Sequence, residues 1–414
     1  MIVMTRMSRL IRLAVLAFAA MLHLAVVASH QPLYAEDTLQ ASDRLTWKKP
    51  HVGPGGGSRE STPAAASTLV PRPSALSPLQ AETSGAVLIQ QAYEQSRQGD
   101  SEGHYSTIIA QCERGIRQGV SRETERYAER LLSWAYNRRG TITAETQREQ
   151  QALEDFETAV QYDNARWRAL HNRGVSYALM GRLEEALADF ARTIELNPRH
   201  ANAYFNRGEL RYKNGQFEEA LKDYDRAVQL APDDSAAYNS RGHTYYQLRK
   251  YPEAVRDFTE ALRLNPQNSA ALANRGQLYS DLGYYARALR DFQRAVEHDP
   301  ELGRAYLGAA WVLATCPEEK YRDAEAAVSA ASKAIELDGD DPLYLDVLGA
   351  AHANSGQFEM AQEAVRAALE KAPEKFQKTI KRRLTAYKQK KPYRSRPQQV
   401  ASVVKQGAKR PVQR

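Results

Sequence analysis

Arginine and aspartate side chains recur at a fixed spacing through the middle of this 414-residue chain. Arginines return every 34 residues, and aspartates do the same; the two series are Arg139, Arg173, Arg207, Arg241 and Arg275, and Asp155, Asp189, Asp223, Asp257 and Asp291. A row of guanidinium groups could bind anions. Alternatively, each arginine pairs with an aspartate of its own repeat or of a neighbouring one, since a planar guanidinium suits a carboxylate. We favour the second interpretation, a structural ion-pair ladder that fixes helix register.

The sequence has none of the spacings that carry enzymatic or metal chemistry. It contains no glycine-rich phosphate loop, no Gly-x-Ser-x-Gly elbow and no His-Glu-x-x-His motif. His171 and His243 stand far apart, and Cys112 and Cys316 are too few for a disulfide framework. We therefore expect no catalytic residue, no metal site and no cofactor.

Four further series recur in phase with the arginines, which indicates an internal repeat of 34 residues. They are Gly174, Gly208, Gly242 and Gly276; Ala186, Ala220, Ala254 and Ala288; Phe190, Tyr224, Phe258 and Phe292; and Pro198, Pro232, Pro266 and Pro300. Within each repeat the alanine, the aromatic residue four positions later and a small residue at the seventh share one helix face. The small residues let two helices approach closely, and proline cannot continue a helix. Each repeat is therefore predicted to be a helix–turn–helix.

On these residues the chain resembles the tetratricopeptide repeat (TPR) family, with four regular repeats over 167–302. Degenerate TPR-like helices are expected over 86–166, and two further repeats over 303–373, the first with an insertion near Cys316. This variant turn looks like one found in exported bacterial TPR proteins. The resemblance implies an all-α TPR solenoid, a right-handed superhelix of about eight helix-turn-helix units.

The resemblance also implies which side chains line the inner surface, formed mainly by the first helix of each repeat. The candidate peptide-binding residues are His171, Asn172, Phe205, Asn206, Glu209, Tyr212, Lys213, Asn239, His243, Tyr246 and Gln247. Aromatic, amide and charged groups together suit an extended peptide or an amphipathic helix. An ordinary solvated face with core tyrosines is the alternative. We expect a non-catalytic scaffold that binds a protein or peptide partner.

The N-terminus has the features of an export signal over residues 1–35. Three arginines up to Arg12 precede 16 residues that are apolar except for His23, which is short for a membrane-spanning helix. An uncleaved N-terminal membrane anchor is the alternative. Residues 36–85 are rich in proline, glycine and serine and are expected to form a disordered linker. These features predict a periplasmic or cell-envelope protein.

The C-terminus is strongly basic, although the whole chain has a net charge of only +7. Residues 374–391 are predicted to form a capping helix over the last open core face. Residues 392–414 are expected to be a basic disordered tail, for which three partners remain open: an anionic membrane or polymer, nucleic acid, or the chain's own acidic repeats. Export makes nucleic acid the least favoured. The tail leaves a second functional hypothesis, a tether to an anionic envelope surface with the repeats as a spacer.

Overall fold

The computed structural model describes residues 84–397. They form two compact units, an N-terminal unit of residues 84–233 and a C-terminal unit of residues 234–397. The predicted export signal (1–35) and all but the end of the predicted linker (36–85) lie outside the described residues, as do residues 398–414. Both units consist of helices joined by short turns, and the described residues contain no β-strand. The prediction of an all-α fold is confirmed.

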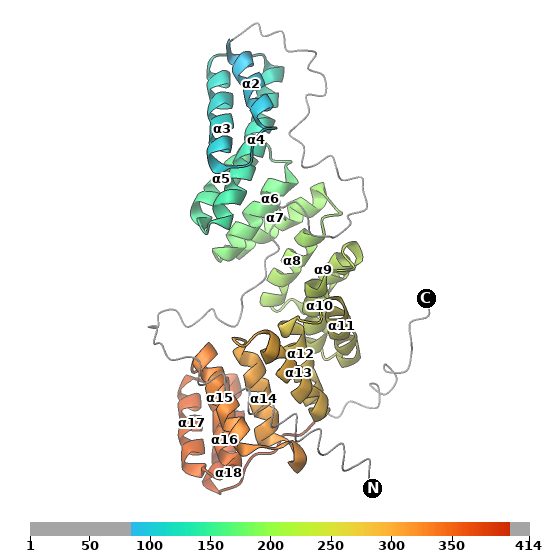
Figure 1. Cartoon of the computed structure of the whole chain (residues 1–414), viewed down its shortest axis with the longest axis vertical. Helices are drawn as coiled ribbons and strands as arrows, with labels where there is room; N and C mark the ends of the chain where they lie inside the picture. The colour runs from blue at the N-terminus through green and yellow to red at the C-terminus, as the bar shows by residue number, and fades with distance from the viewer. Residues whose placement is uncertain (1–83, 398–414) are drawn as a thin grey trace, which may run out of the picture. The chain divides into compact units, whose positions relative to one another are not determined.

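The N-terminal unit contains eight helices that follow one another in chain order (Figure 1). They are α2 (Ser84–Gln95), α3 (Glu102–Arg117), α4 (Arg122–Glu145), α5 (Glu149–Tyr162), α6 (Trp167–Leu179), α7 (Leu183–Leu196), α8 (Ala201–Lys213) and α9 (Phe217–Leu230). Helix α4 begins well before the repeat predicted at 133–166, and it contacts both α3 and α5. The degenerate N-terminal segment therefore shares one long helix between two packing partners.

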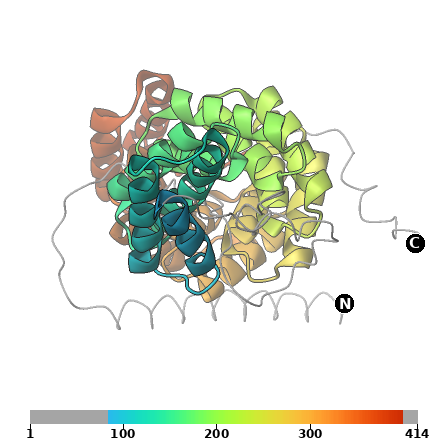
Figure 2. The same cartoon turned by 90° about the horizontal axis from the view of Figure 1, so that it is seen from above.

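The C-terminal unit continues the same alternation of first and second helices (Figures 1 and 2). Its helices are α10 (Ser235–Gln247), α11 (Tyr251–Leu264), α12 (Ser269–Asp281), α13 (Tyr285–His298), α14 (Gly303–Thr315), η1 (Glu319–Tyr321), α15 (Ala324–Asp338), α16 (Pro342–Asn354), α17 (Phe358–Lys371) and α18 (Glu374–Lys388). The short 3₁₀ helix η1 occupies the predicted insertion between the two helices of one repeat.

The two helices of a hairpin approach closely because glycine faces an aromatic ring. A Cβ atom built on Gly208 would lie 3.0 Å from Cε1 of Tyr224, a ring that is 1% exposed. The alanine of the same second helix, Ala220, is fully buried. Apolar burial of about 25 cal/mol per Å² stabilises this contact, which recurs in every regular repeat.

The turns inside the hairpins require a left-handed residue. Gly181, Gly215 and Gly283 have φ of 75°, 73° and 79° at the end of their first helices. Arg249 stands at the same place in the repeat between, with φ of 57°. A non-glycine residue is strained in this conformation, so the fold holds Arg249 there against its local preference.

First helices of successive repeats contact one another within each unit. In the N-terminal unit α4 contacts α6 and α6 contacts α8; in the C-terminal unit α10, α12, α14 and α16 form a second such series. We call the side of each unit formed by these helices its first-helix face. The predicted binding residues all belong to these helices, so this face is where they must be sought.

The segment after α18 returns to the C-terminal unit. Residues 391–397, which we call the C-terminal strap, have no regular structure, and Ser395 is hydrogen-bonded to Thr315 at the end of α14. The prediction for 392–414 was a disordered tail, and the structure differs from it over 392–397. In the capping helix itself Ile380 and Tyr387 are buried, whereas Phe376, expected on the same stripe, is 52% exposed.

Candidate functional site

The five ladder arginines each bind the aspartate of their own hairpin. Every arginine donates from Nε and Nη2 to the two carboxylate oxygens of the aspartate 16 residues later, at 2.7–3.0 Å. The aspartate side chains are 4–10% exposed and the arginine side chains 15–24%. The ladder therefore connects the first helix of a repeat to its second helix, and not to a neighbouring repeat.

A tyrosine ring accompanies each of these ion pairs. The guanidinium carbons lie 5.1–5.8 Å from the ring centroids; the pairs are Arg139–Tyr136, Arg173–Tyr177, Arg207–Tyr204, Arg241–Tyr238 and Arg275–Tyr279. Hydrogen bonds to Asp189 also raise the pKa of Arg173. Carboxylate and ring together occupy the directions in which the guanidinium could bind a ligand. This geometry favours ion pairs over anion sites.

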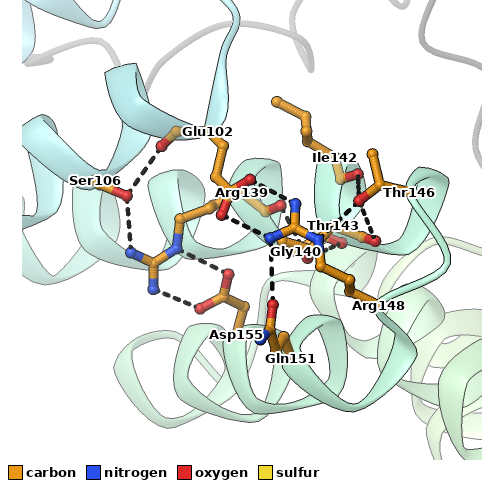
Figure 3. A network of polar contacts seen from close by, with 10 residues as sticks. All are labelled: Glu102, Ser106, Arg139, Gly140, Ile142, Thr143, Thr146, Arg148, Gln151 and Asp155. Atoms are coloured by element: carbon orange, nitrogen blue, oxygen red, sulfur yellow. Dashed lines mark hydrogen bonds and ion pairs between the residues drawn. The ribbon is translucent and has the colours of Figure 1, made fainter.

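The first pair of the ladder belongs to a larger polar network (Figure 3). Arg139 donates from Nη1 to Oγ of Ser106 at 3.1 Å, in addition to its two bonds to Asp155. Nearby, Arg148 binds both carboxylate oxygens of Glu102. These contacts connect α3, α4 and α5, so the irregular N-terminal helices are fixed by charge as well as by their apolar core.

Asparagines on the first-helix face bind the preceding repeat. Each donates from Nδ2 to a side chain 35 residues earlier: Asn172 to Asn137 Oδ1 at 2.9 Å, Asn206 to His171 Nε2 at 3.2 Å, and Asn274 to Asn239 Oδ1 at 3.0 Å. The partner nitrogen of histidine accepts in the tautomer drawn here. These amides therefore join successive first helices, and sequence reasoning, which gave them to a ligand, missed this role.

His171 is enclosed between hairpins and remains neutral. Its ring is 1% exposed and lies 4.7 Å, centroid to centroid, from the ring of His200. Burial lowers the pKa of His171 to about 4, and it lowers the pKa of His200 as well. A protonated imidazole here would lack water and face a second histidine, so the cluster favours neutral rings.

Most predicted binding residues of the N-terminal unit are buried, which corrects their assignment to an open surface. The buried members are His171, Asn172, Phe205, Asn206 and Glu209. Phe205 packs against Tyr224 with centroids 5.9 Å apart, and Glu209 accepts a hydrogen bond from the Tyr224 hydroxyl at 2.7 Å. Because successive first helices pack together, side chains at these register positions are covered by the neighbouring repeat.

The remaining predicted residues are at least partly accessible. Tyr212 is half-buried and Lys213 exposed at the end of α8 in the N-terminal unit. On α10 in the C-terminal unit, Asn239, His243 and Tyr246 are half-buried and Gln247 is exposed. The structure therefore narrows the candidate site to the C-terminal turns of the first helices.

An aromatic and acidic cluster lies on the first-helix face of the C-terminal unit. The rings of His243 and Tyr246 are stacked, with centroids 6.2 Å apart. The Tyr246 hydroxyl donates to Asp281 Oδ2 at 2.5 Å, and Gln277 Nε2 donates to Asp281 Oδ1 at 3.0 Å. Burial raises the pKa of Asp281, while these two hydrogen bonds oppose the rise. We call these four residues the Tyr246–Asp281 cluster.

A pocket of about 410 Å³ lies at the other end of the described chain, where the α2–α3 loop meets α4. Its acidic lining residues Asp100 and Glu102 are already bound to Arg138 and Arg148. No predicted site residue lines it. Ion pairing of these carboxylates leaves the pocket without an obvious chemical function.

The described residues hold no group of three or more histidine, cysteine or acidic side chains that could bind a metal ion. Cys112 and Cys316 are both free and buried. Within 84–397, every helix is too short or too polar to cross a membrane. Burial also raises the pKa of the Cys316 thiol to about 11, so it is not activated as a nucleophile.

Comparison with known proteins gives matches to one repeat family and to several solved structures. Family models of the tetratricopeptide repeat match residues 171–235, 235–268 and 269–302. No curated protein matches the sequence.

Similar solved structures include a tetratricopeptide repeat protein from Parabacteroides merdae ATCC 43184, 21% identical, covering 62% of this chain and 98% of that chain with a TM-score of 0.47. MamA 41-end from Desulfovibrio magneticus RS-1 is 19% identical, covering 41% and 96% with a TM-score of 0.38. YrrB, described as a TPR protein with an unusual peptide-binding site, is 21% identical, covering 41% and 88% with a TM-score of 0.37.

Proposed function

Because the chain is a tetratricopeptide-repeat protein, we propose that it is a non-catalytic scaffold that binds a peptide or a partner helix on its first-helix face. Repeats of this class present side chains from successive helices on one surface. The observation that carries the proposal is the Tyr246–Asp281 cluster, which combines two stacked rings with a half-buried carboxylate.

The chemistry of the cluster suits a segment with hydrogen-bond donors. Asp281 has one hydrogen bond to each carboxylate oxygen, from Tyr246 and from Gln277. A carboxylate has about four acceptor positions, so a peptide N–H or a basic side chain can be added without displacing either bond. The exposed amide of Gln247 at the end of α10 offers a further contact to a peptide backbone. Stacked aromatic rings supply apolar contact area at low entropic cost.

The test is a crosslinking pull-down, followed by affinity measurement on whichever partner segment is recovered. The variant replaces Tyr212, His243 and Tyr246 by alanine, since these side chains are partly accessible. Phe205→Ala is unsuitable, because that ring is 1% exposed and its loss would damage the core. The control replaces the exposed second-helix residues Arg192 and Arg263 by alanine. Equal partner affinity of the triple variant and the control would refute the proposal.

We further propose that the protein is exported to the periplasm or cell envelope, since its first residues have the composition of an export signal. Cell fractionation and N-terminal sequencing of the mature protein test this; full-length protein recovered in the cytoplasm would contradict it. The tether hypothesis gains no support from the described part of the tail. Contacts of residues 393–395 go to the chain's own α14, leaving only 398–414 for an envelope surface.

A further inference from the structure

The C-terminal strap is bound to the main chain at the end of α14. The backbone N–H of Ser395 donates to the carbonyl oxygen of Thr315 at 2.8 Å, and its hydroxyl donates to the same oxygen at 3.2 Å. Arg394 donates from Nη1 to the carbonyl oxygen of Ala314 at 3.2 Å. Two consecutive strap residues are thus read by two consecutive carbonyl groups of one helix end.

The neighbouring strap residue enters an aromatic stack. The Tyr393 ring lies 5.7 Å from the ring of Trp311, centroid to centroid. The guanidinium of Arg383 lies 5.6 Å from Trp311 and 5.4 Å from Tyr393. Arg383 is itself held by two hydrogen bonds to the buried carboxylate of Asp346, so α18 and α16 fix the position that receives the tyrosine.

The end of α14 depends on outside groups for its carbonyl oxygens. Its last turn contains no basic residue. The carbonyls of Val312 and Leu313 are bound by N–H groups of the chain that follows, and Arg322 binds the carbonyls of Cys316 and Pro317. Among the contacts of the described residues, the carbonyls of Ala314 and Thr315 receive donors from the strap. A helix C-terminus favours cations and N–H donors, which is what Arg394 and Ser395 supply.

We propose that Trp311, Arg383 and the carbonyls of Ala314 and Thr315 form a binding site for an extended aromatic–arginine–serine segment. Residues 393–395 are its intramolecular ligand, and a segment of the same chemistry on a partner protein displaces them. Specificity comes from three independent features: the ring stack takes the aromatic residue, the helix terminus takes the cation, and the Thr315 carbonyl takes the following N–H. This site is separate from the Tyr246–Asp281 cluster and does not depend on the proposed function.

The experiment measures binding of a labelled peptide, Lys-Pro-Tyr-Arg-Ser-Arg-Pro, to the full-length chain by fluorescence anisotropy. Tyr393→Ala/Arg394→Ala releases the strap and leaves the site intact. Arg396→Ala is the matched control, because Arg396 lies in the same segment but is exposed. If the strap occupies the site about nine-tenths of the time, the apparent Kd for the peptide is raised about tenfold. We therefore expect the double variant to bind the peptide at least tenfold more tightly than the wild type and Arg396→Ala.

Two further arms keep the test sharp. A peptide with alanine in place of tyrosine and arginine should bind the released variant at least tenfold more weakly than the original peptide. Ser395→Pro, which removes the N–H donor, should also open the site to the original peptide. Circular dichroism checks that each variant keeps its helices. The proposal is overturned if the released variants bind no peptide, if they bind no better than the wild type, or if the alanine peptide binds equally well.

Discussion

The ion pair between Arg275 and Asp291 allows the ladder to be tested quantitatively. Its two hydrogen bonds are 2.7 and 3.0 Å long, and the side chains are 15% and 5% exposed. Asp291→Ala leaves the guanidinium with a 3.4 Å contact to Thr259 Oγ1 and the Tyr279 ring among its described neighbours. Removing one partner of a buried pair costs about 3–5 kcal/mol, because the other charge stays buried without compensation. We expect the lower part of this range, since the arginine retains some contact with water.

The double variant Arg275→Leu/Asp291→Ala should be less destabilised than the sum of its two single variants. It removes both charges, and buried ion pairs replaced by apolar residues often cost little. The chain itself shows that such a replacement is tolerated, because Ala309 and Ala330 occupy the two ladder positions in a later repeat and both are fully buried. We expect a coupling energy of about 2–3 kcal/mol from the cycle.

Urea unfolding followed by far-ultraviolet circular dichroism measures these free energies, with hydrogen exchange of α12 and α13 as the local readout. The exposed pair Arg263–Glu260 is the control, since its side chains are 66% and 35% exposed at a comparable distance of 2.7 Å. Exposed helical pairs of this kind contribute about 0.3–0.5 kcal/mol. The ladder hypothesis is wrong if the coupling energy of Arg275 and Asp291 is no larger than that of the control pair.

Three further substitutions test other parts of the fold. His171 has its pKa lowered to about 4, so the unfolded chain takes up the proton first and unfolding free energy should fall by about 3 kcal/mol between pH 6.5 and pH 4; urea titrations should show this slope reduced in His171→Asn, and an unchanged slope would contradict the assignment. Arg249→Gly should raise the urea midpoint by relieving φ of 57°, a gain of about 0.5–1 kcal/mol, and a lower midpoint would argue against strain. Gly242→Ala should cost about 1–3 kcal/mol, because a Cβ would lie 3.0 Å from the ring of Phe258; a variant as stable as the wild type would show that the helices can separate freely.

The hairpin pattern could be predicted from sequence because it depends on local spacing. Gly208, Ala220 and Tyr224 show in the sequence which faces must meet, and a period of 34 repeats the statement. Pairing of arginine with aspartate was also visible, since repeats lacking one member lack the other. The choice between the same hairpin and a neighbouring one was not visible, because it depends on how far apart the helices stand in space. The structure gives the same hairpin, with Arg207 bound to Asp223.

Burial on the first-helix face could not be predicted in the same way. His171 and Asn206 hold polar side chains at positions where a ligand could bind, and nothing in their types distinguishes a surface amide from one that bonds to the next repeat. The distance between successive first helices decides it, and the structure closes that distance to a hydrogen bond of 3.2 Å. The strap was missed for another reason. Ser395 binds the Thr315 carbonyl, and a main-chain acceptor leaves no trace in the sequence.

Charge pairing continues beyond the ladder, but it changes partners at the C-terminal end. In the last repeat Leu348 and Ala364 occupy the ladder positions, and the buried carboxylate of that repeat, Asp346, is bound by Arg383 of the capping helix. Arg383 also lies beside Tyr393 in the strap. Since one guanidinium serves both contacts, weakening its bond to Asp346 should also loosen the aromatic stack. The cap that closes the core and the segment that covers α14 are therefore coupled through a single side chain, so a partner that displaces the strap would act on the stability of the array's end.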